Sequence, residues 1–79
     1  MRKISSTYSL LEKLTREMIN VLSRIDGEES VTIVREGSMA LNKWLSSDPD
    51  TKERRDASID IGIFQKKALV LIMRKKQGT

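Results

Sequence analysis

The chain has 79 residues, with 15 Lys and Arg against 11 Asp and Glu for a net charge of +4, and it has no cysteine and no histidine. This length suits a single domain, 1–79, and is too short for two. Without cysteine a disulfide framework and thiolate metal sites are excluded, which indicates a reducing, cytoplasmic location. No apolar run approaches the roughly 20 residues that a membrane-spanning helix needs, and Arg2 and Lys3 do not lead into the apolar region of a secretory signal.

The first predicted elements are a short strand over residues 2–5 and an amphipathic helix over about residues 8–26. Apolar residues recur there at three- and four-residue intervals and form one stripe: Leu11, Leu14, Met18, Leu22 and Ile25. Ser9 with Glu12 fits a capping box, and Gly27 supplies a helix stop.

The next segment, residues 30–35, is rich in β-branched residues and lies between two glycines, which favours a strand. A shorter helix over residues 38–46 should follow, with Trp44 as a core anchor and Pro49 preventing its continuation. Residues 48–56 are polar and predict an exposed loop. They lack the spacing of a calcium-binding loop, so we expect no metal there.

The last predicted element is a β-hairpin. Ile59, Ile61 and Ile63 alternate with smaller or polar residues over residues 57–64, which is typical of a half-buried strand. After a basic turn at residues 65–67, the strand over residues 68–74 is apolar on both faces. Residues 77–79 read as a frayed tail.

Taken together, these elements predict an α/β fold: a two-layer βαβαββ sandwich with two helices on one face of a small mixed sheet. Residues 30–43 are similar to the strand, glycine turn and helix start of Alba-type proteins. The sporulation protein S branch of that superfamily has a Gly-x-x-Ala-Leu-Asn pattern, which matches Gly37, Ala40, Leu41 and Asn42.

The Alba-type resemblance implies a homodimer that binds DNA or RNA through basic residues. By position, Lys43 corresponds to the family's lysine at the helix start, while Lys66 and Lys67 would lie on the projecting hairpin. The C-terminal domain of bacterial translation initiation factor three shares this topology and would imply RNA.

The residue inventory argues against an enzyme. Without histidine and cysteine, the commonest general base and nucleophile pairs are missing. The glycines never cluster into a phosphate-binding loop, and no pair of carboxylates lies in an apolar context that would shift a pKa. We therefore expect no catalytic residues, no cofactor and no metal.

The positive charge is concentrated at the C-terminal end, and it predicts a nucleic-acid-binding protein of low sequence specificity. Residues 52–79 hold eight basic and three acidic groups, hence +5. Such a cluster can neutralise phosphates. The predicted contacts are Lys43, Arg54, Arg55, Lys66, Lys67, Arg74, Lys75 and Lys76. Phe64 could stack on an unpaired base, with burial in the core or an interface as its alternative.

The apolar final strand also predicts a homodimer. Leu69, Leu71 and Met73 would share one strand face, and in a monomer one of the two apolar faces would lie bare. Two other functions stay open. One is a winged helix-turn-helix regulator of the phage type, with residues 30–46 as the recognition helix and the hairpin as the wing. The other is a protein-binding inhibitor or adaptor that uses its charges for steering.

Overall fold

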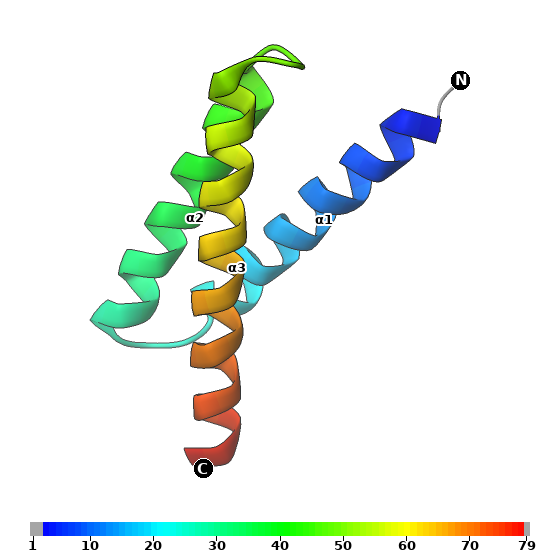
Figure 1. The fold of residues 1–79 in the computed structure, drawn as a ribbon. Helices are drawn as coiled ribbons and strands as arrows, with labels where there is room; N and C mark the ends of the chain where they lie inside the picture. The colour runs from blue at the N-terminus through cyan, green and yellow to red at the C-terminus, as the bar shows by residue number, and fades with distance from the viewer. Residues whose placement is uncertain (1–2, 79) are drawn as a thin grey trace.

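The computed structural model describes residues 3–78, and these residues form three helices (Figure 1). Helix α1 spans Lys3–Ser23, α2 spans Glu28–Ser46 and α3 spans Lys52–Gly78. Within residues 3–78 there is no strand, so the predicted βαβαββ sandwich is wrong. No helix in this part of the chain is long and apolar enough to cross a membrane.

Helices α2 and α3 form an antiparallel pair, and α1 crosses one side of it (Figure 1). The C-terminal half of α1 packs on the pair, whereas its N-terminal half points away from α2 and α3. The core has two adjoining clusters, one around Leu22, Phe64 and Leu71 and the other around Trp44 and Ile61. The molecule is accordingly elongated, with extents of 45, 22 and 15 Å.

Helix α2 includes the segment that was predicted to be a strand. Its buried residues recur at steps of three and four along the chain, with one adjacent pair at residues 40 and 41: Ser30, Ile33, Gly37, Ala40, Leu41 and Trp44. That spacing buries one helical stripe, and burial outweighs the β preference of Val31 and Val34. The strand over residues 30–35 is therefore wrong. The predicted Alba-type fold is wrong for the same reason, because residues 30–43 all lie within one helix.

Helix α3 replaces the predicted β-hairpin. Its buried residues follow a 4, 3, 4, 3 spacing: Ala57, Ile61, Phe64, Ala68 and Leu71. Such a pattern turns one face of a single continuous helix toward its neighbours. The predicted turn at residues 65–67 lies in the middle of this helix. The wing of a winged helix is absent from residues 3–78 as well, although residues 31–34 are helical as that alternative requires.

The turn between α1 and α2 depends on Gly27. This residue has a φ of 127°, a backbone conformation that residues with a side chain rarely adopt, and it directly precedes α2. The hydroxyl of Ser30 donates to the carbonyl of Ile25 at 2.6 Å and so closes the turn. Helix α1 ends at Ser23, three residues before the predicted end, and begins at Lys3. Over residues 3–5 it replaces the predicted strand, whose first residue, Arg2, lies outside the described residues.

Candidate functional site: a groove between α2 and α3

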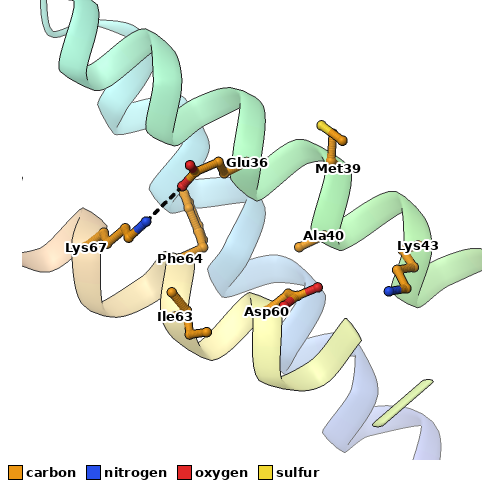
Figure 2. A pocket seen from close by; sticks show the side chains of 8 residues that line it. All are labelled: Glu36, Met39, Ala40, Lys43, Asp60, Ile63, Phe64 and Lys67. Atoms are coloured by element: carbon orange, nitrogen blue, oxygen red, sulfur yellow. Dashed lines mark hydrogen bonds and ion pairs between the residues drawn. The ribbon is translucent and has the colours of Figure 1, made fainter. Parts of the chain in front are cut away.

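A surface groove lies between α2 and α3. Its volume is about 510 Å³, and its lining residues, drawn in Figure 2, are Glu36, Met39, Ala40, Lys43, Asp60, Ile63, Phe64 and Lys67. A second hollow of about 410 Å³ shares Glu36 and Lys67 with it and continues along Thr32, Val70 and Arg74. Helix α1 packs elsewhere on the pair, where the Gln65 amide donates to the Thr15 hydroxyl at 3.3 Å.

Charged residues line both walls of the groove at seven-residue intervals. Those of α2 are Glu29, Glu36 and Lys43, and those of α3 are Asp60, Lys67 and Arg74. Seven residues are close to two helical turns, so each set stays on one side of its helix. The antiparallel arrangement of the helices then brings the two sets level with each other.

Each charged residue of α2 lies opposite a charged residue of α3, and we call such a pair of positions a level of the groove. The two residues of each level have opposite charges. Lys67 Nζ lies 3.2 Å from Glu36 Oε1, and Arg74 Nη2 lies 2.7 Å from Glu29 Oε2. Figure 2 shows the first pair bridging the groove and shows Lys43 and Asp60 on the opposing helices at one end of it. These side chains are about half exposed in the two ion pairs, so each pair contributes little to stability by itself.

Exposed apolar residues occupy the levels between the charges. Met39 and Ile63 lie between the Glu36 level and the Lys43 level, with 65% and 48% of their surface exposed. Val70 lies between the Glu36 level and the Glu29 level and is 56% exposed. The groove therefore presents charged and apolar layers in alternation along its length.

The floor of the groove is formed by close packing of α2 on α3. Phe64 is buried against Gly37, so of its two predicted roles core burial applies and base stacking does not. The wide ring beside a residue without a side chain lets the two helices approach closely at this point.

The predicted phosphate-binding residues do not form one surface. Lys43, Lys67 and Arg74 line the groove beside carboxylates. Arg54 binds the end of α2, because its Nε donates to the Ser47 hydroxyl at 2.9 Å and its Nη2 to the Ser47 carbonyl at 2.6 Å. Four others lie exposed along α3: Arg55, Lys66, Lys75 and Lys76.

The predicted dimer interface is also corrected. Leu71 is 2% exposed and belongs to the core, whereas Leu69 and Met73 are about half exposed. Alternate residues share a face in a strand but lie about 200° apart on a helix, so these three cannot form one surface.

Among the described residues, no group of three or more Asp or Glu side chains could hold a metal ion. Comparison of the chain with protein-family models, with curated proteins and with solved structures finds no match.

Sequence reasoning missed six residues that build the groove: Glu29, Glu36, Met39, Asp60, Ile63 and Val70. The signal was present in the two seven-residue charge series, each of which marks one wall.

Proposed function

We propose that this chain is a non-catalytic protein-interaction module that binds an amphipathic helix of another protein chain in the groove between α2 and α3. The observation that carries the proposal is the exposure of Met39, Ile63 and Val70 along the groove, at positions between charged residues that recur at heptad spacing. Apolar anchors at three- and four-residue intervals are how one helix recognises another in helix-in-groove binding.

The shape of the groove supports a helix as its ligand. From Glu29 to Lys43 the wall of α2 spans 15 residues, which corresponds to a rise of about 21 Å. Small molecules prefer concave sites that enclose most of their surface. A long, shallow and apolar groove instead matches one face of a helix of about four turns.

The charges provide orientation. Along α2 the groove wall changes from acidic to basic, and along α3 it carries the opposite sign at every level. A helix with complementary charges on its two flanks would be attracted in one direction and repelled in the other. Complementary potentials of this kind contribute mainly to specificity and to the association rate.

A peptide titration tests this proposal. The probe is a synthetic amphipathic helix of about 21 residues with Leu and Ile at its a and d positions, acidic on one flank and basic on the other. In NMR spectra of dilute protein, the methyl signals of Met39, Ile63 and Val70 should shift saturably. Those of Ile59 and Leu45, which are exposed outside the groove, should not.

The matched variant for this titration is Met39→Glu, which places a charge in an apolar layer and should abolish the saturable shifts. Equal shifts at all exposed apolar residues would show non-specific adsorption and would overturn the proposal.

A second candidate function is nucleic-acid binding. Arg55, Lys66 and Lys75 favour it, because they are exposed on α3 and have no ion-pair partner in the described structure. Nucleic-acid binding is tested by titration with duplex DNA, single-stranded DNA and RNA at two salt concentrations. Each phosphate contact contributes about −0.9 to the slope of log affinity against log salt on duplex DNA. Lys66→Glu with Lys75→Glu should weaken binding and flatten that slope, and a parent protein without salt-dependent binding would eliminate this candidate.

A further inference from the structure

We propose that the face of the molecule that carries the groove packs against the same face of a second copy of this chain, related to the first by a two-fold axis that runs along the groove. This inference rests on the proposed function, since it names the partner of the same site. Its physical basis is that the charge pattern of the groove is complementary to itself under this particular symmetry.

The symmetry determines which helices meet. A two-fold axis parallel to the groove places α2 of one copy against α3 of the other at the same level, and the two run antiparallel. Every neighbouring pair in the assembly is then antiparallel, as α2 and α3 are within one chain (Figure 1). The product is a four-helix bundle built from two hairpins, with an identical surface on both sides as two-fold pairing requires.

At each charged level, opposite charges face each other between the copies. Glu36 faces the partner's Lys67, and Lys67 faces the partner's Glu36. The same holds for Glu29 with the partner's Arg74, and for Lys43 with the partner's Asp60. The Glu36–Lys67 and Glu29–Arg74 ion pairs already exist within one chain, so the dimer doubles each of them into a ring of four alternating charges.

The apolar layers also match. Met39 meets the partner's Ile63, and Thr32 meets the partner's Val70, so the exposed apolar surface of the groove is covered in both copies. Polar layers between apolar layers are a known device for selecting one register and one oligomeric state in helical assemblies.

The alternative is a two-fold axis that lies in the plane of the interface and runs perpendicular to the groove. The same charges disfavour pairing about this axis. That arrangement would pair α2 with the partner's α2, and α3 with the partner's α3. At the central level Glu36 would face the partner's Glu36, and Lys67 would face the partner's Lys67. Like charges at an interface are costly, so the charge pattern selects the axis along the groove.

The small size of the surface is typical of weak or transient pairing. Helix α2 has 19 residues, hence a length of about 28 Å, and two packed helices are roughly 20 Å wide. The buried area is then roughly 550 Å² per chain, below the roughly 800 Å² of a standard interface. We therefore expect a dimer with a dissociation constant in the micromolar range.

A charge-swap experiment tests both the partner and the axis. The variant E36K/K67E exchanges the two central charges and keeps their ion pair within the chain. With the axis along the groove, this variant should form dimers as the parent does. It should not form mixed dimers with the parent, because Glu36 would then face a glutamate and Lys67 a lysine. An axis across the groove predicts the reverse, namely a preference for mixed dimers.

The single variants E36K and K67E serve as matched controls. The homodimer of each single variant should have a dissociation constant about tenfold or more above that of the parent. A mixed dimer of one E36K chain and one K67E chain should be as tight as the dimer of the parent. The readout is sedimentation velocity from about 1 to 500 μM, with one species labelled by a fluorophore and helix content checked by circular dichroism.

The outcomes separate the two proposals. Preferred or statistical mixing of the parent with E36K/K67E overturns the symmetric pairing, and so does a parent that remains a 9.0 kDa monomer at all concentrations. If that monomer still binds the synthetic peptide at Met39, Ile63 and Val70, the groove remains a protein-docking site. If it does not bind, both proposals fall.

Discussion

A methyl group added at Gly37 would lie 2.5 Å from Cε1 of Phe64, closer than any real contact between carbon atoms allows. The ring of Phe64 is buried and forms the floor of the groove. The separation of α2 and α3, and with it the shape of the groove, therefore depends on the absence of a side chain at this one position.

Gly37→Ala should destabilise the protein. Overpacking a core costs about 1–3 kcal/mol, and alanine recovers only about 0.8–1 kcal/mol through its helix propensity. We expect a net loss of up to about 2 kcal/mol in the free energy of unfolding, measured by urea denaturation. Gly62→Ala is the control, because nothing lies within 4 Å of the added carbon, and it should stabilise by about 0.5–1 kcal/mol. Equal effects at both positions would contradict the close approach.

Leu71→Lys distinguishes the helical core from the predicted strand interface. Leu71 is 2% exposed, so a lysine there should remove at least the 2–5 kcal/mol typical of Leu→Ala, and the protein should lose its fold. Leu69→Lys alters a residue that is 49% exposed and should leave helix content unchanged. Circular dichroism checks both variants. A folded, monomeric Leu71→Lys protein would favour the strand interface instead.

Arg54→Ala should weaken the junction between α2 and α3. The guanidinium lies 4.4 Å from the Trp44 ring centroid and donates two hydrogen bonds to Ser47. Losing these contacts should cost about 1–2 kcal/mol and shift the fluorescence of Trp44, the single tryptophan. The neighbouring exposed Arg55→Ala should change stability by less than about 0.5 kcal/mol. An Arg54→Ala protein as stable as Arg55→Ala would argue against this role.

Reversing either charge of the Glu36 and Lys67 pair should leave the monomer folded. Both side chains are about half exposed, and exposed ion pairs contribute about 0–1 kcal/mol. The midpoint of thermal unfolding at low protein concentration should therefore move by only a few degrees. A collapse of the fold in Glu36→Lys would mean that the pair has a structural role within one chain.

The sequence predicted α1 with errors at its ends and the C-terminal end of α2 at Ser46, yet it failed for α3. Alternation of Ile59, Ile61 and Ile63 spans only five residues, a length at which strand and helix patterns overlap. Of these three residues only Ile61 is buried. The longer 4, 3, 4, 3 series that starts at Ala57 continues across the predicted turn at residues 65–67. Dividing the segment at this turn therefore concealed the helical spacing.

The groove could have been predicted in part. Glu29, Glu36 and Lys43 share a seven-residue spacing, as do Asp60, Lys67 and Arg74, and both series are visible in the sequence. Their pairing requires knowledge that α2 and α3 are antiparallel and in a particular register. That register depends on packing such as Phe64 on Gly37, which no local propensity encodes.

The central claim is that two copies pair about a two-fold axis along the groove. Disulfide cross-linking tests this claim most directly, because the chain contains no cysteine of its own. Met39→Cys and Ile63→Cys chains, one of them isotope-labelled, are mixed and oxidised, and the products are identified by mass spectrometry. Pairing along the groove places position 39 against the partner's position 63, so the mixed disulfide should exceed both symmetric products. Ile59→Cys, exposed outside the groove, should show no such excess with Met39→Cys. A statistical distribution of products, or no disulfide at all above the expected dissociation constant, would contradict the pairing.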